Sequence, residues 1–381
     1  MAAGHKLWRR SRLLPADPED AGQGSAPSSA AARSNRCLVH FPAHDQEALT
    51  LTSSPAWLRA DWGEHQMAGK EHSIERGKVH YKWDNSLPPA IEINPGDVVH
   101  FQTEEVTDGQ IKPGSPASAL TSLDFNRLYP LAGPVFVKGA QPGDVLEVEM
   151  LELRPLEWGW TGLIPGLGLL AQDFPEPYIR HFDLSNGETT SLTDKVKIPL
   201  QPFCGTMGVA TDDPGPIEVL PPTKGAGNID TRHLNVGTKL YLPVFMPGGM
   251  FSTGDCHGTQ GDGEVCVTGI ECPMVVSLRF NVVKDRKIKP WRYQFQTPPG
   301  SLQPKSDAKG YFATTALGPD LMENARNAVR DLIDWLGDEH GLSREDAYVL
   351  CSLAADLKIS QIVDQPNWGV SAYLSLAVFT G

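Results

Sequence analysis

The 381-residue chain lacks the features that mark membrane-spanning and nucleic-acid-binding proteins. It contains no apolar run that approaches the roughly 20 residues of a membrane-spanning helix. Positive charge is also in short supply, because 33 lysines and arginines face 46 aspartates and glutamates, which gives a net charge of −13. Such a balance disfavours nucleic acids and anionic membranes, so we expect neither as a partner.

Several common signatures are missing as well. The six cysteines are scattered without a Cys-x-x-Cys pair, which predicts a reducing, cytoplasmic environment rather than a disulfide framework. There is no Gly-x-Ser-x-Gly elbow, no His-Glu-x-x-His, no Walker loop and no Gly-x-Gly-x-x-Gly after a predicted strand. The common serine hydrolases are therefore disfavoured. Cys266 stays open as a nucleophile two residues after Glu264, although a small hydrophobic role is the ordinary interpretation of a cysteine in an apolar segment.

Residues 1–36 differ in composition from the rest of the chain. The stretch Trp8–Leu14 is basic, and sequence rich in serine, alanine and glycine follows it. This composition is typical of organellar transit peptides, which would send the protein to the mitochondrion. Asp17, Glu19 and Asp20 speak against import, because transit peptides are poor in acidic residues. We predict a disordered extension outside the fold, with import as the alternative.

The remaining sequence has the texture of a β-rich protein. Thirty-two prolines and 37 glycines separate short apolar runs from residue 37 to about 300. The segment 151–190 is irregular and predicts a long ordered loop region. We expect strands at four further places: Val196–Leu200, Leu240–Phe245, Val265–Ile270 and Val275–Phe280.

Helical periodicity appears only near the C-terminus. Apolar residues recur every three or four positions between Leu321 and Leu336, which predicts one amphipathic helix. Ser343 then predicts the capped start of a second helix that runs from Ala347 to about Leu357. The fold class is therefore α+β and β-dominated, with a multi-stranded sandwich or barrel-like core. We place the catalytic β-rich core at 37–290 and a smaller α/β portion at 291–381.

Two segments of the β-rich part resemble each other. Ile91–Phe101 and Val135–Val148 each contain Pro-Gly-Asp between two alternating apolar runs. We interpret each as a hairpin, with the Pro-Gly-Asp sequence as its turn.

The densest polar chemistry lies at residues 250–266. Asp255 and His257 are two residues apart, and so are Asp262 and Glu264, so an extended chain would present each pair on one face. The glycines between them permit tight turns that fold one pair toward the other. Carboxylates and an imidazole gathered in this way repel one another unless they share protons or a cation. The spacing favours a divalent ion, which could be zinc, manganese or calcium. A solvated Gly/Asp-rich hairpin loop is the alternative.

Weaker candidates lie elsewhere. The glycine-rich loop 225–230 carries Asn228, which could hydrogen-bond an amide, and Asp230, which could bind a metal. Trp83 and Asn85 precede a predicted strand and are candidates for substrate binding. Asp108 follows another strand and is a candidate metal ligand. Capped turns explain each of these equally well.

With these residues laid out, the chain resembles the acetamidase/formamidase family from about Val39 to Phe379. The block Phe251–Glu264 carries the resemblance with high specificity. Supporting motifs are Trp83–Pro89, Pro95–Asp97, Leu131–Val135, Gly139–Leu146, Pro202–Ala210, Gly227–Asp230 and Ile362–Trp368. Two positions depart from the family: Glu105–Gln110 stands where Asp-Ala-Ser-Gly-Gly-Gln is frequent, and Ser375 stands where proline is common.

The resemblance implies hydrolysis of formamide or acetamide to carboxylate and ammonia, a β-dominated fold and a homo-oligomer. Our mechanistic hypothesis has a divalent ion, zinc in the first instance, on Asp255, His257 and Asp262. Asp230 or Asp108 would complete its ligands. Glu264 would act as general base toward the water that the ion activates.

The oxyanion would be stabilised by Asn228 or by backbone amides of the glycine loops. Two alternatives stay open. One is a hydrolase of a larger amide, carbamate or imide on the same scaffold. The other is a non-catalytic binding protein whose loop 255–264 is stapled by calcium.

Overall fold

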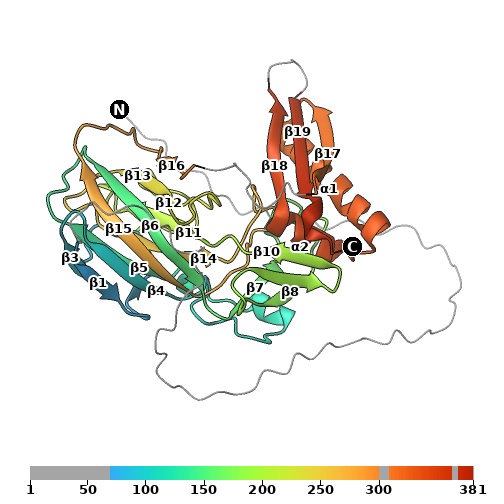
Figure 1. Cartoon of the computed structure of the whole chain (residues 1–381), viewed down its shortest axis with the longest axis horizontal. Helices are drawn as coiled ribbons and strands as arrows, with labels where there is room; N and C mark the ends of the chain where they lie inside the picture. Colours follow the sequence, from blue (N-terminus) through green and yellow to red (C-terminus); the bar gives the residue numbers. More distant parts are fainter. Residues whose placement is uncertain (1–68, 300–308, 363–367, 381) are drawn as a thin grey trace, which may run out of the picture. The chain divides into compact units, whose positions relative to one another are not determined.

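The computed structural model describes residues 69–299, 309–362 and 368–380 (Figure 1). All of them belong to one compact unit, 53–381. The predicted extension 1–36 lies outside the described residues. Within the described ranges the structure is β-dominated, with only two α-helices, as the composition predicts.

Two six-stranded sheets form the centre of the fold. The order of the first sheet is β1 (Glu71–Ile74), β4 (Val98–Thr103), β15 (Met274–Val283), β6 (Val145–Pro155), β13 (Lys239–Pro243) and β16 (Gln294–Gln296). The order of the second is β12 (Ala226–Asn228), β11 (Phe203–Val209), β14 (Phe251–His257), β5 (Leu131–Val137) and β2 (Val79–His80), and β3 (Ile91–Ile93) pairs with β5.

The two sheets pack face to face through large apolar side chains. Phe101 and Phe280 from the first sheet contact Phe251 from the second, with ring centroids 6.5 and 5.1 Å from its own, and all three are fully buried. Inner-face residues that interdigitate in this way are what holds a β-sandwich together. The predicted sandwich is therefore confirmed.

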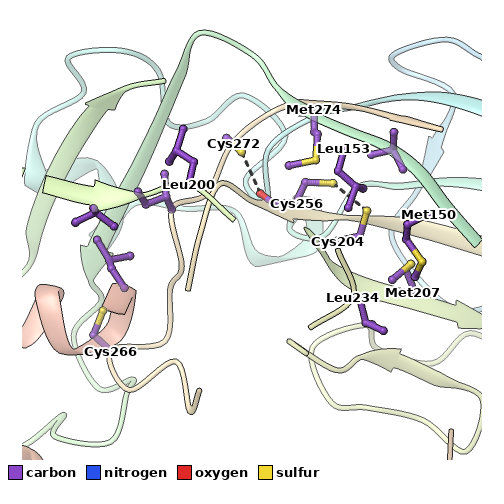
Figure 2. Packing of buried hydrophobic residues seen from close by; sticks show 14 of the residues in the cluster. Met150, Leu153, Leu200, Cys204, Met207, Leu234, Cys256, Cys266, Cys272 and Met274 are labelled. Carbon is purple, nitrogen blue, oxygen red and sulfur yellow. Dashed lines mark hydrogen bonds between the residues drawn. The ribbon is translucent and has the colours of Figure 1, made fainter. Parts of the chain in front are cut away.

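A sulfur-rich region fills part of the core next to β14 (Figure 2). Cys256 of β14 lies opposite Cys204 of β11, with 3.6 Å between their sulfurs, and Cys272 lies against the carbonyl of Cys256. Figure 2 shows Met150, Met207 and Met274 around them. The cysteines in the described ranges are free thiols, and all of them are buried. On β14 the core residue Cys256 therefore stands between Asp255 and His257, which have ionisable side chains.

The Pro-Gly-Asp segments are not hairpin turns, which corrects our interpretation. β3 pairs in parallel with β5 in the second sheet, while β4 and β6 both pair with β15 in the first sheet. Each turn therefore carries the chain from one sheet to the other. The alternating apolar patterns are the same in a hairpin and in such a corner, because in both cases one face of each strand is buried.

Smaller elements connect the sheets and precede the C-terminal part. The segment predicted as irregular contains the antiparallel pair β7 (Trp158–Leu163) and β8 (Tyr178–Asp183). A second pair is β9 (Thr189–Thr193) with β10 (Val196–Pro199). The predicted strand Val265–Ile270 is wrong: this stretch is a loop, and β14 before it is the strand.

The C-terminal part is a three-stranded sheet, β17 (Tyr311–Gly318), β19 (Trp368–Ser375) and β18 (Ala355–Gln361), with two helices. α1 (Leu321–His340) buries the predicted apolar face and ends at Gly341 in a left-handed conformation. α2 (Arg344–Ala354) is capped by the Ser343 hydroxyl, which accepts a hydrogen bond from the Asp346 N–H. Neither helix, and none elsewhere in the described ranges, is long and apolar enough to cross a bilayer. The proposed boundary at 290/291 stays a prediction.

Candidate active site

Five ionisable side chains meet at one end of β14 and form what we call the acid cluster: Asp230, Asp255, His257, Glu264 and Glu271. The four carboxylates line a cavity of about 180 Å³. His257 lies behind them with 1% of its side chain exposed, 3.5 Å from the Asp255 carboxylate and 3.3 Å from that of Glu271. Those two distances are measured from Nε2 of the ring, and Nδ1 is 3.9 Å from the Glu264 carboxylate.

Three of these carboxylates are carried by a strained backbone. Asp230, Asp255 and Glu264 have φ values of 39°, 52° and 43°, in the left-handed region that side chains other than glycine rarely adopt. Val267 in the same loop has φ 77°, which is more unusual still for a β-branched residue. Strain of this kind persists only where the surrounding structure enforces it, and it concentrates at functional sites.

Two glycines make room for the cluster. A Cβ atom at Gly205 would lie 2.5 Å from the Asp230 carboxylate and 3.0 Å from that of Asp255. A Cβ atom at Gly269 would lie 2.7 Å from Nδ1 of His257. Any other residue at these two positions would push the cluster apart, so both glycines are needed for close approach.

Gln260 fixes the orientation of the His257 ring. Its amide nitrogen donates to the Asp230 carbonyl at 3.0 Å, so its amide oxygen faces Nδ1 of His257 at 2.8 Å. Nδ1 must then donate its proton to that oxygen. Nε2 is left facing Asp255 and Glu271, where it can act as a ligand or accept a proton.

The electrostatics of the cluster reflect its burial. Burial, reinforced by the nearby Asp255, raises the pKa of Asp230 to about 8. Burial also raises the pKa of Glu271 to about 7, although His257 opposes it, and that of Glu264 well above its ordinary value. Burial alone would lower the pKa of His257, but Glu271 and Asp255 outweigh it and hold that pKa well above the usual range. Without a cation, the cluster therefore retains shared protons.

The donor set suits a divalent ion. One group of ligand atoms combines Asp255, His257 and Glu271, and another combines Asp230, His257 and Glu264; within each, all atoms lie within 4.8 Å of one another. Oδ1 of Asp230 and Oε2 of Glu271 are buried, and neither has a hydrogen-bond partner among the described residues. Because a buried carboxylate oxygen without a partner is costly, these two atoms indicate a missing positive charge. Because Nδ1 of His257 donates to Gln260, Nε2 is the ring nitrogen available to an ion, and it belongs to the group with Asp255 and Glu271.

Besides the four carboxylates, the cavity is lined by uncharged polar residues and by apolar residues. Asn228, Thr107 and Thr268 add polar groups beside the carboxylates, and Tyr129 lies close enough for all four of them to act on its phenol. Burial, followed by Asp255 and the other acids, raises the pKa of Tyr129 well above its ordinary value, so the phenol stays protonated. The remaining lining residues are apolar: Val106, Leu123, Phe125, Leu128, Trp160, Ile164, Leu167, Leu220 and Val267.

A known protein family matches nearly all of the described residues. The model of the acetamidase/formamidase family matches residues 67–217 and 215–381. The chain belongs to this family. Family membership, together with its curated relatives, makes the protein a hydrolase of non-peptide amide C–N bonds.

Known members are moderately similar in sequence. A formamidase from Methylophilus methylotrophus is 27% identical over 369 residues, which cover 80% of this chain and 90% of that enzyme. An acetamidase structure from Bacillus halodurans is 32% identical, with a TM-score of 0.56, and covers 80% of this chain and 97% of its own. A gamma lactamase from Delftia acidovorans, at 23% identity and a TM-score of 0.74, shares the fold over 81% of this chain and 94% of its own.

Within this family fold, two of the predicted metal ligands lie away from the acid cluster. Asp262 points toward His233, 3.7 Å from its ring nitrogen, and is not among the residues that line the cavity. Asp108 accepts hydrogen bonds from the Tyr81 hydroxyl at 2.8 Å and from Nε of Arg127 at 3.1 Å. Both carboxylates therefore have ordinary partners of their own. Only the predicted ligands Asp230, Asp255 and His257 meet.

The predicted substrate-binding residues are divided in the same way. Asn228 lines the cavity, where its amide oxygen accepts from Thr206 at 3.1 Å and its amide nitrogen donates to the Leu220 carbonyl at 3.0 Å. Trp83 is buried against Leu131 and Val219, outside the cavity lining. Asn85 clamps a loop by donating to the carbonyls of Thr211 and Asp213.

The structure also places the alternative nucleophile and reveals site residues that the sequence did not predict. Cys266 is buried in the main core and does not line the cavity. Glu271, Tyr129 and Gln260 were not predicted. Glu271 did leave a signal in the sequence: it is the one charged residue in the mostly apolar stretch between Val265 and Arg279. Tyr129 and Gln260 left no comparable pattern.

Proposed function

We propose that the protein hydrolyses short aliphatic amides, formamide or acetamide, to carboxylate and ammonia with the help of a divalent ion. The observation that carries the proposal is the acid cluster itself, which lies at the floor of a cavity. It combines the buried carboxylates of Asp255 and Glu271 and the partly buried ones of Asp230 and Glu264 with an imidazole, and two of the carboxylate oxygens have no hydrogen-bond partner among the described residues. Membership of the acetamidase/formamidase family and the names of its members support the substrate class.

Asp255, Nε2 of His257 and Glu271 would hold the ion, and Asp230 is a further candidate ligand. Zinc is our first choice, because imidazole combined with carboxylates is a common zinc ligand set, whereas calcium sites are mostly all oxygen. When bound, such an ion lowers the pKa of a coordinated water toward about 7 and polarises a carbonyl.

The chain's own residues would handle the protons. Glu264 lines the cavity and carries a raised pKa, so it suits the general base that takes a proton from the attacking water. The same carboxyl group would then deliver that proton to the leaving nitrogen, which departs as ammonia. Its strained backbone holds the carboxylate toward the cavity rather than toward solvent.

Hydrogen-bond donors near the floor would stabilise the developing oxyanion. Tyr129 presents a phenol that stays protonated, and Asn228 retains one amide N–H beyond the one given to Leu220. A single preorganised donor of this kind is worth about 3–4 kcal/mol in systems where one was removed. Tyr129 is favoured over Asn228, because both ends of the Asn228 amide already have partners.

The test is ammonia release from formamide and acetamide by metal-analysed protein, before and after chelation. We expect activity to disappear on chelation and to return with one divalent ion. Glu264→Gln should bind the metal but turn over at least about 100-fold more slowly, within the range for general acid–base catalysis. Near-normal turnover by metal-loaded Glu264→Gln would rule out its role as base. Full activity without metal would overturn the metal-assisted reaction.

Membership of the acetamidase/formamidase family disfavours the alternative of a non-catalytic binding protein stapled by calcium. That the enzyme is a cytoplasmic homo-oligomer stays a prediction.

A further inference from the structure

The cavity is larger than the amides named above require. Its volume is about 180 Å³. An apolar cavity of about 150 Å³ is enough to hold benzene, with six carbon atoms. Formamide has three non-hydrogen atoms and acetamide four, so on the same scale either would leave a substantial part of the space unfilled. Unfilled space next to apolar walls contributes nothing to binding, because the contacts that would fill it are missing.

The walls beyond the acid cluster are apolar and distinct from the main core. Val106, Leu123, Trp160 and Ile164 belong to a separate hydrophobic cluster that also contains Ile111 and Leu120. All four of the first-named residues line the cavity. The polar lining consists of the four carboxylates with Thr107, Tyr129, Asn228 and Thr268, and the other lining residues are apolar, so the cavity combines groups for chemistry with apolar surface for binding.

The apolar lining continues to the surface. Phe125, Leu167 and Leu220 are 59%, 36% and 46% exposed and line the same cavity. Large apolar side chains at the rim of a concave site are typical of ligand-binding pockets. They add exposed apolar surface to the lining that Trp160 contributes from within the structure.

The wall is also preformed. The buried Glu105 carboxylate accepts hydrogen bonds from Nε1 of Trp160 at 3.0 Å, from the Thr107 hydroxyl at 2.6 Å and from the Gly109 N–H at 2.7 Å. Trp160 and the loop that carries Val106 are therefore fixed before a substrate arrives. A preorganised wall adds affinity because no side chain has to be ordered on binding.

We propose that the preferred substrates are primary amides with an apolar acyl chain of about four to six carbons, sized to a cavity that compares with the benzene-holding one. This inference rests on the proposed amide hydrolysis at the acid cluster. The amide group would lie on the floor, and the chain would run along Val106 and Trp160 toward Leu167. Each methylene buried there should raise kcat/KM about fourfold.

The test is a substrate series with the metal-loaded full chain. Ammonia release is measured for acetamide, propanamide, butanamide, pentanamide and hexanamide. 3-Methoxypropanamide, which has the length of pentanamide but an ether oxygen in its chain, is the polar control. We expect kcat/KM to rise along the series and to be several-fold lower for the ether than for pentanamide, since the ether oxygen would lose its hydration without gaining a partner.

Variants locate the effect on the wall. Leu167→Ser should lower the ratio of kcat/KM for hexanamide to that for acetamide several-fold. Leu317→Ser is the matched control: Leu317 is 70% exposed on β17, outside the cavity lining, and its replacement should leave the ratio unchanged. Because both leucines are partly solvated, neither change should prevent folding.

The outcomes separate the two proposals. A kcat/KM that falls or stays flat from acetamide to hexanamide, with turnover still dependent on Glu264, overturns the inference and leaves the proposed function intact. A rise that Leu167→Ser does not reduce also overturns the assignment to this wall. No ammonia from any amide overturns both proposals.

Discussion

Glu105 and Glu271 are two buried glutamates of the same cavity region with opposite surroundings. Neither is more than 2% exposed. Glu105 accepts four hydrogen bonds, from the Thr107 N–H and hydroxyl, the Gly109 N–H and the Trp160 indole. Glu271 accepts one from the Gly269 N–H at 2.9 Å and faces His257 at 3.3 Å, and within the described part of the chain its second oxygen has no partner.

The number of partners differs between the two groups while their burial does not, and on this ground we propose a structural role for Glu105 and a metal-binding role for Glu271. Burial raises the pKa of both groups, while the hydrogen bonds of Thr107, Trp160 and Gly109 oppose the shift at Glu105. The lone pairs of the Glu105 carboxylate accept hydrogen bonds from residues that form the cavity wall. Glu271 keeps lone pairs available, which is the property that a metal ligand needs.

The largest expected effect comes from Glu271→Gln. Activity on amides should fall about 10³-fold, beyond the 10- to 100-fold loss typical when an outer partner of a metal ligand is removed. The free energy of unfolding of the metal-free protein should change little, because the loss of one partner of the buried His257 imidazolium, which keeps Asp255, is offset by the smaller repulsion among the carboxylates. Steady-state kinetics and denaturant unfolding check both parts. A variant that loses stability but keeps activity would place Glu271 with Glu105 as a structural residue.

Glu105→Gln should produce the opposite result. The amide presents a donor to groups that are themselves donors, so the protein should lose about 3 kcal/mol of stability, the upper range for hydrogen bonds to a charged group. Thermal unfolding measures the loss. Glu104→Gln is the matched control, since Glu104 is partly exposed and forms an ion pair with Arg76 at 3.6 Å. Its change should be within about 0.5 kcal/mol.

Gln260→Ala tests how the cluster is oriented. Without the amide oxygen, Nδ1 of His257 loses its acceptor, and kcat/KM should drop about 10- to 100-fold. Gln260→Glu keeps an acceptor and should recover part of the rate, with a shifted pH profile because a carboxylate makes the imidazole more basic. An unchanged pH profile in Gln260→Glu would contradict direct coupling between the two side chains.

Asp97→Asn should give the smallest effect. Asp97 is a buried carboxylate with several hydrogen-bond partners, and it is not among the residues that line the cavity. Burial works against its charge, but the Asn94 N–H, the His72 ring and the Lys70 N–H hold the pKa of Asp97 below its ordinary value. Since the pKa is lower when folded, the stabilisation is present above the unfolded pKa of about 3.9 and is lost as pH falls through the folded value.

We expect Asp97→Asn to cost about 1 kcal/mol at pH 7. The difference from the parent protein should shrink steadily below about pH 4. Asp338→Asn on the exposed face of α1 serves as the control and should show no such dependence. A difference that stays constant down to pH 2 would mean that packing of the turn, and not the charge, is what Asp97 contributes.

The sequence by itself determined the β-dominated class, both helices and the central pair of the site. Alternation and proline–glycine punctuation are local patterns, and α1 and α2 are specified by periodicity and capping within a few residues. Asp255 and His257 could be predicted to meet because both lie at the end of one strand, where residues two apart approach each other.

Only the tertiary structure decided which other acids join them. The same two-residue rule failed for Asp262 and Glu264, because their loop is not extended and Glu264 has a left-handed backbone that turns its side chain away from the direction of Asp262. Asp230 reaches the cluster because Ile229 and Asp230 both donate backbone hydrogen bonds to Gly205, across 24 and 25 residues of chain. Glu271 arrives by pairing of its segment with Trp160 and His257. Contacts between segments so far apart depend on how the sheets pack, which no local pattern specifies.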